Sequence, residues 1–285
     1  MSLSRRDFLR TTGIAGVAVV VSAAGCNNPS QTSDDDPISR LQSMTTDIVP
    51  ITVDERLARI EKARRLMQDN NIDAMYVESG TGLFYYTGVR WGRSERMLAV
   101  VIPARGDIAY ICPGFEEERL RELIMIGDDV RIWEEDESPY QRVAQIFTDR
   151  GIRNGTIGME ERVRFFLFEG IRKAAPRLTY VSADSVTIPC RSIKSPAEIA
   201  LMQRAMDITI EAYKVCVASL KEGMSQSEFR DISAAAHKAL GANGGIGVQM
   251  GQNTAFPHGS KEQTYLKEGD VVLMDGGCKV DGYSS

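Results

Sequence analysis

A single acidic side chain, Asp275, follows a continuously apolar run, Val271–Met274, in the segment VVLMDGGCKVDGYSS that closes the sequence. An apolar run of this kind predicts a strand covered on both faces. An ionised carboxylate at the end of such a strand is costly to bury unless it is paired or binds a cation. Two interpretations of Asp275 are therefore open: it is a metal ligand, or it caps the Gly-rich turn that follows.

The expected pairing of this strand with the next one favours the metal ligand. Asp281-Gly282 is a preferred two-residue hairpin turn, which would place residue 280 opposite residue 283. In that register, Asp275 and the position eleven residues after it would be diagonal neighbours on one face, with Cα atoms roughly 5.5–8 Å apart. A carboxylate there would converge with Asp275 on one or two cations, but that position lies beyond Ser285.

The composition is that of a soluble globular protein. Of the 285 residues, 43% are hydrophobic and 26% are charged. The net charge of −5, with no basic stripe carrying interleaved aromatic residues, argues against a nucleic-acid partner. The five Cys include no C-x-x-C pair, which argues against a thiolate metal site or a disulfide framework. Because there are only two His, any metal site within this chain would depend on carboxylates.

The first 26 residues have the pattern of an export signal. The segment SRRDFLR at residues 4–10 precedes the apolar run GIAGVAVVVSAA at residues 13–24, which is too short to span a hydrocarbon core of about 30 Å. The paired arginines followed by this short apolar run resemble a twin-arginine signal; a short membrane anchor is the alternative. SAAGC, ending at Cys26, resembles a lipoprotein processing box, so we expect an exported, extracytoplasmic or periplasmic protein lipid-anchored through Cys26. Ordinary cleavage nearby, with an incidental Cys, is the other interpretation.

The remaining chain divides into three parts. Residues 27–50 are rich in Ser, Asp, Asn and Thr and predict a disordered tether. Strands and helices alternate from residue 51 to about 185, which predicts a layered α/β domain, with residues 80–89 as a turn-rich connection. Ser195 and Ser225, each followed three residues later by Glu, predict two capped helices in a second domain. We place the boundary between residues 188 and 189.

Several segments, in this order, resemble the pita-bread metallopeptidases, in particular the aminopeptidase P and prolidase group. DAMYVESGTGLFYYTGV and IGMEE are similar to its creatinase-type N-terminal domain, and IKSPAEIALMQRAMDI to the opening of its catalytic domain. NTAFPHG and EGDVVLMDGGCKVDGYSS resemble its metal-binding region. The resemblance covers residues 51–285. It implies an α/β fold with a creatinase-type domain at residues 51–188, followed by the first part of an α+β pita-bread domain at residues 189–285, truncated at its C-terminus.

The resemblance also implies a function. The family uses two divalent metal ions, for which Mn, Co, Zn and Fe remain open, to hydrolyse the Xaa-Pro bond at peptide N-termini. Asp275 matches its first metal ligand, and His258 matches a substrate-side catalytic His; without the resemblance, a surface loop His would be the favoured interpretation of His258. The family's other metal ligands come later, so we expect residues 1–285 alone to be inactive. His237 lies mid-helix and is interpreted as structural.

Two other function classes stay open. A creatinase-like amidinohydrolase, or another non-peptidase hydrolase or lyase, can share this fold, and so can a non-catalytic exported relative. Asp275 favours a metal-binding member. The partners we expect are small peptides with proline at the second position and further copies of the same chain, because relatives are often dimers or tetramers.

Overall fold

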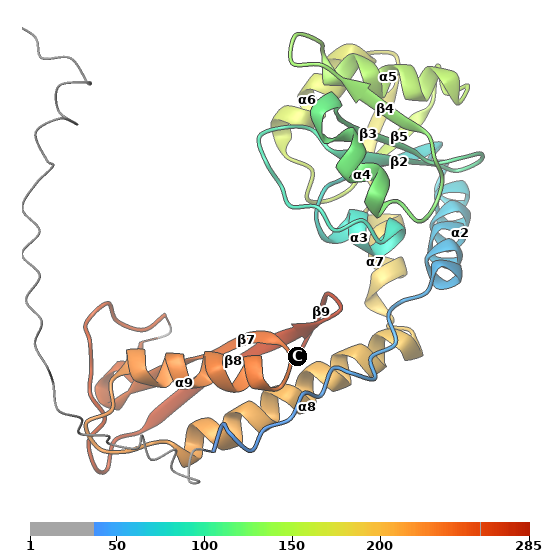
Figure 1. The fold of residues 1–285 in the computed structure, drawn as a ribbon. Coiled ribbons are helices and arrows are strands. Elements are labelled where there is room, and N and C mark those ends of the chain that lie inside the picture. The colour runs from blue at the N-terminus through green and yellow to red at the C-terminus, as the bar shows by residue number, and fades with distance from the viewer. Residues whose placement is uncertain (1–36, 257) are drawn as a thin grey trace, which may run out of the picture.

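The computed structural model describes residues 37–256 and 258–285, which form two units that meet near residues 193–195 (Figure 1). The N-terminal unit contains α2 (Val53–Asp69), β1 (Ala74–Glu78), α3 (Thr81–Thr87), β2 (Ala99–Pro103), β3 (Ala109–Pro113), η1 (Gly114–Glu116), α4 (Glu117–Leu123), β4 (Val130–Trp133), α5 (Pro139–Asp149), β5 (Thr156–Met159), α6 (Phe165–Ala174), β6 (Thr179–Ser182) and α7 (Asp184–Ser192). The C-terminal unit contains α8 (Pro196–Ala218), α9 (Gln226–Ala239), β7 (Asn243–Met250), η2 (Gly251–Ala255), β8 (Val272–Val280) and β9 (Tyr283–Ser284).

The N-terminal unit is a three-layer α/β domain. Its sheet has the order β4-β3-β2-β1-β5-β6, in which β2 pairs antiparallel with β1 and β3 and the other pairs are parallel. Every residue of β1 is buried because its alternating side chains enter two cores. Met75 and Val77 join the core with α2 and α7, and Ala74 and Tyr76 join the core with α5 and α6. The predicted layered α/β domain is confirmed.

One connection in this unit differs from the prediction. Residues 80–89 are not a turn-rich return: they contain the helix α3, which begins after Gly80 and ends at Gly88. Gly88 has φ 83°, the left-handed conformation that terminates helices and that residues other than Gly rarely adopt. The Gly residues that suggested turns therefore flank a short helix.

The junction between the units lies slightly later than residues 188–189. That predicted boundary falls inside α7, which packs against α2. Val186 and Cys190 of α7 belong to the same buried core as Ile60 and Met67 of α2. The N-terminal unit therefore extends through Ser192.

The segment before α2 is attached to the C-terminal unit. Ile38, Leu41, Met44 and Ile48 pack against that unit's core, and the Met44 amide donates to the Leu240 carbonyl at 2.9 Å. The expectation of a disordered tether therefore fails for residues 37–50, because their widely spaced apolar side chains have a surface to cover. Residues 27–36 and the predicted signal, including Cys26, lie outside the described residues.

The C-terminal unit is an antiparallel sheet, in the order β7-β8-β9, with α8 and α9 packed against it (Figure 1). Both helices begin with the predicted capping boxes, in which Ser195 pairs with Glu198 and Ser225 with Glu228. Within the described residues, none of the helices combines the length and apolar character needed to span a membrane.

Candidate functional site

Asp275 lies on the face of the sheet that the two helices leave open. Leu273 and Val271 on that side of the strand are 45% and 66% exposed, whereas Cys278 and Val280 are buried in the core. Asp275 itself is exposed. The predicted burial of this strand on both faces is wrong within the described residues, because α8 and α9 cover one face only. Water therefore reaches the Asp275 carboxylate.

The hairpin that follows Asp275 has the predicted register. Val280 pairs with Tyr283 and Lys279 with Ser284. The two turn residues, Asp281 and Gly282, have φ of 46° and 88°, the positive values that a type I′ turn requires at both central positions. The turn therefore fixes which residues of β8 share the open face with Asp275.

His258 and Asp275 line the same hollow. This hollow has a volume of about 270 Å³ and is bordered by Gln226, Arg230, Gly247, Val248, Gln249, His258, Gly259, Ser260, Leu273 and Asp275. His258 reaches it from the loop after η2, and its side chain is exposed. The structure thus brings together the two described residues that the sequence singled out, from positions 17 apart in the chain.

The floor of this hollow is bare backbone beside the carboxylate. Gly247 of β7 lines the hollow and is paired directly opposite Asp275. A Cβ atom on Gly247 would lie 3.3 Å from the Asp275 backbone carbonyl oxygen. The absence of side chains here leaves space for a bound molecule next to Asp275, while α9 contributes the Arg230 guanidinium at the rim.

Gln249 positions the loop that carries His258. With its amide oriented to match its neighbours, Gln249 donates to the carbonyls of Asn253 (2.7 Å) and Phe256 (3.0 Å) and accepts from the Gly259 amide (3.1 Å). These contacts lie on both sides of His258. Gln249 was not predicted from the sequence; its one sequence signal is its place in β7, on the same side of the strand as Gly245 and Gly247.

The described residues do not form a complete metal site. Among residues 37–256 and 258–285, no group of three or more His, Cys, Asp or Glu side chains is placed to hold a metal ion. Asp275 and His258 are the carboxylate and imidazole that border the hollow. One carboxylate and one imidazole suit a divalent cation in kind but are too few for two ions. We therefore assign no catalytic step to metal ions on the described residues.

Asp275 also influences a residue of α8. Burial raises the pKa of the Tyr213 hydroxyl, and the nearby Asp275 carboxylate raises it further. Tyr213 therefore stays neutral at physiological pH. It can donate a hydrogen bond on the helix side of β8.

His237 has surroundings that match the structural interpretation. It is fully buried in α9, and its Nδ1 lies 2.8 Å from the Ser233 carbonyl oxygen.

A larger hollow, of about 440 Å³, lies at the junction of the two units and is bordered by Phe84, Tyr85, Glu198 and Tyr283 among others. It contains neither Asp275 nor His258, so it is separate from the candidate site.

Comparison with known families divides the chain in the same way. Residues 59–193 match the Creatinase/Prolidase N-terminal domain, and residues 200–285 match Metallopeptidase family M24. An uncharacterized peptidase of Schizosaccharomyces pombe is 29% identical over 262 residues, which is 85% of this chain and 56% of that protein. The chain thus spans little more than half of this relative's length.

Solved structures show the same fold. A prolidase from Thermococcus sibiricus has a TM-score of 0.72 at 24% identity, covering 80% of this chain and 62% of its own. A dipeptidase from Pyrococcus horikoshii has a TM-score of 0.70 at 26% identity, covering 80% and 63%. The fold is a creatinase N-terminal domain followed by part of an M24 pita-bread domain.

Proposed function

We propose that this chain carries the first metal-binding strand of a metal-dependent peptidase that hydrolyses the Xaa-Pro bond at the N-terminus of small peptides. The observation that carries the proposal is the shared hollow of Asp275 and His258, on the open face of the β7–β8 sheet. The matches to the creatinase and M24 domains, and the peptidase, prolidase and dipeptidase names of the relatives, support it.

Each of the two side chains has a role in this proposal. Asp275 would contribute a carboxylate ligand to two divalent ions, which would be Mn, Co, Zn or Fe, and such ions would lower the pKa of a bound water. His258, exposed on its loop, orients the peptide by hydrogen bonding. The remaining ligands for two ions come from outside the described residues, so residues 1–285 alone are inactive.

The chemistry of proline accounts for a dedicated enzyme. A proline after the scissile bond has no amide N–H, so a protease that recognises this donor fails on such peptides. Selectivity must then come from a pocket shaped for the ring. Gly247, which lines the hollow opposite Asp275 and has no side chain, leaves space for such a group.

The setting of the enzyme is also part of the proposal. The residues before Cys26 direct export by a twin-arginine-type route, and acylation of Cys26 anchors the protein on the extracytoplasmic side of a membrane. The protein acts as a homo-oligomer. Residues 37–50 pack on the C-terminal unit, so any tether between Cys26 and the folded part is limited to about ten residues.

Hydrolysis assays test the proposal. The product of the complete reading frame and residues 1–285 alone are each loaded with Mn²⁺ or Co²⁺ and given Gly-Pro, Xaa-Pro-Xaa peptides and creatine. We expect the former to cleave the proline peptides, to lose this activity with a chelator, and to leave creatine intact. Cleavage of creatine alone would establish the amidinohydrolase instead. No turnover of any substrate would favour a non-catalytic relative, and clear turnover by residues 1–285 would refute the need for further ligands.

A further inference from the structure

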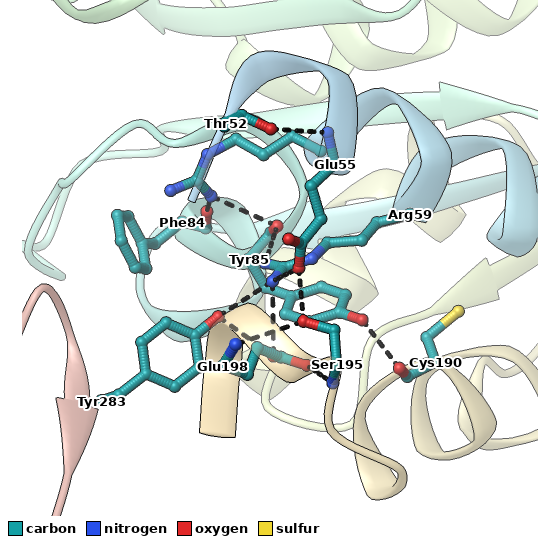
Figure 2. Close-up of polar contacts among 10 residues, drawn as sticks. Thr52, Glu55, Arg59, Phe84, Tyr85, Cys190, Ser195, Glu198 and Tyr283 are labelled. Carbon is teal, nitrogen blue, oxygen red and sulfur yellow. Dashed lines mark hydrogen bonds and ion pairs between the residues drawn. The ribbon is translucent and has the colours of Figure 1, made fainter. Parts of the chain in front are cut away.

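A buried polar cluster joins the two units at the far end of the β8–β9 hairpin (Figure 2). Its centre is Arg59 of α2, which is 6% exposed. Its guanidinium donates to the Glu55 carboxylate at 2.7 Å, to the Tyr283 hydroxyl at 3.1 Å and to the Tyr85 carbonyl at 3.1 Å. It also lies 3.4 Å from Glu198 Oε1. Arg59 therefore contacts residues of both units at once.

The contacts form a closed ring. The Tyr283 hydroxyl donates to Glu198 Oε1 at 3.0 Å, and the Glu198 Oε2 accepts from the Ser195 amide at 2.8 Å as part of the α8 capping box. The Ser195 hydroxyl donates to Glu55 Oε1 at 2.7 Å, and the same Glu55 oxygen accepts from the Arg59 guanidinium, which closes the ring. Because Glu198 is 3% exposed, its charge is stabilised by these partners and not by water.

Tyr283 is held in this ring as a donor. Burial raises the pKa of its hydroxyl to about 12, which keeps the proton on the oxygen at physiological pH. The hydroxyl can therefore accept from Arg59 and donate to Glu198 at the same time.

A second contact holds the turn next to Tyr283. Arg90 Nη2 lies 2.6 Å from Asp281 Oδ1, and its guanidinium stacks on the Phe84 ring at 4.0 Å. A Cβ on Gly282 would lie 2.7 Å from Phe84 Cε1, so the turn sits directly on α3. Arg90 is half exposed, and such a pair is weak on its own. The buried ring around Arg59 is therefore the stronger of the two attachments.

The attachment reaches the strand that carries Asp275 through one residue of β9. Tyr283 pairs with Val280 of β8, and its hydroxyl is held by Arg59 of the N-terminal unit. The β8 residues that follow Asp275 are thus linked to the N-terminal unit through Tyr283.

We propose that the ring of Glu55, Arg59, Ser195, Glu198 and Tyr283 is a clasp by which the N-terminal unit fixes the β8–β9 hairpin. Arg59 and Tyr283 are then positioning residues for Asp275. The clasp itself follows from the described contacts; its effect on metal binding at Asp275 rests on the proposed function.

Labelling of buried thiols tests the clasp in residues 1–285. Cys278 lies in β8, is 4% exposed and has its Sγ 3.3 Å from the Ala205 carbonyl oxygen, so N-ethylmaleimide reaches it only when the hairpin opens. We expect Tyr283→Phe to speed labelling of Cys278 at least fivefold. Cys216 of α8, in the same unit, and Cys112 of β3 should keep their rates, because neither lies in the hairpin that opens.

A matched substitution controls for the loss of a hydroxyl. Tyr180→Phe removes a hydroxyl that donates to the Ala175 carbonyl at 2.9 Å, away from the junction. It should leave Cys278 labelling unchanged. A Tyr283→Phe effect on Cys278 of less than fivefold, or an equal rise for Cys216, would overturn the clasp, since an equal rise means general destabilisation.

Cobalt binding tests the positioning role separately. In the product of the complete reading frame, Tyr283→Phe should weaken Co²⁺ binding at least fivefold and alter the visible absorption of the bound ion. Unchanged affinity and spectrum, with faster Cys278 labelling, would overturn the positioning of Asp275 while leaving the clasp. If the unsubstituted protein takes up no Co²⁺, the proposed function fails, and thiol labelling still decides the clasp.

Discussion

A methyl group added to Gly244 should destabilise the C-terminal unit far more than one added to its neighbour. Gly244 of β7 is paired with Cys278 of β8. A Cβ atom there would lie 2.6 Å from the Cys278 Cβ and 2.8 Å from the Gly277 carbonyl oxygen, and it would also overlap the buried His237 ring. Two of these atoms belong to the backbone or to the first side-chain carbon, so no rotamer change removes the overlap.

The size of the effect follows from this geometry. Adding carbon atoms to a packed core typically costs about 1–3 kcal/mol. Because β7 and β8 would have to separate to relieve the overlap, we expect Gly244→Ala to cost about 3 kcal/mol, the upper end of that range. That is roughly a hundredfold in the folding equilibrium. Gly245→Ala, whose Cβ would meet nothing within 4 Å, should change the free energy of unfolding by less than about 0.5 kcal/mol.

Urea unfolding of residues 1–285 distinguishes the two variants. Both Trp residues, Trp91 and Trp133, pack in the N-terminal unit, so their fluorescence follows that unit alone. Hydrogen exchange of the β7 and β8 amides follows the C-terminal unit. We expect a lower unfolding midpoint for the C-terminal unit of Gly244→Ala, with the tryptophan signal unchanged. Equal effects of the two substitutions would refute the packing derived for this strand pair.

Two further predictions concern a buried acid and the His258 loop. Burial raises the pKa of Glu160, and the Glu161 carboxylate adds to the effect. An acid whose pKa is raised in the folded state costs the protein stability as the pH rises through that pKa. The free energy of unfolding of Glu160→Gln, measured by tryptophan fluorescence, should therefore increase relative to wild type between pH 4 and pH 7. A difference between the two proteins that does not vary with pH would contradict the raised pKa of Glu160. Gln249→Ala should speed hydrogen exchange in residues 251–259 at least tenfold, because it removes three hydrogen bonds to that loop. The control Gln252→Ala, at an exposed position, should leave the exchange rates unchanged. Equal exchange in the two variants would contradict the role of Gln249.

Features set by neighbouring residues could be predicted from the sequence. The Asp281-Gly282 turn, the register of Val280 with Tyr283 and the capping boxes at Ser195 and Ser225 depend on two to four consecutive positions. The alternation of strands and helices likewise predicts the layered N-terminal unit. These are local rules, and the structure confirms them.

Features set by distant contacts could not be predicted. The apolar run before Asp275 is covered on one face only, and this depends on which helices reach the sheet. The clasp joins Arg59 to Tyr283 across 224 positions and Ser195 to Glu55 across 140, so no local pattern reveals it. Periodicity also could not show that residues 37–50 would pack on a unit that begins at residue 196.

The candidate site shows the same division. Asp275 was identified from its place in a strand and a hairpin, and His258 from a resemblance, and the structure places both at one hollow. The role of Gln249 could not be predicted, because its hydrogen bonds form only once the loop after η2 folds back over β7.

Metal content tests the central claim most directly. The product of the complete reading frame, its Asp275→Asn variant and a control, Asp231→Asn at an exposed position of α9, are loaded with Co²⁺, desalted and measured by plasma mass spectrometry. We predict two bound ions per chain for the parent and the control, and fewer than one for Asp275→Asn. An Asp275→Asn protein that still holds two ions would contradict the assignment of this carboxylate as a metal ligand.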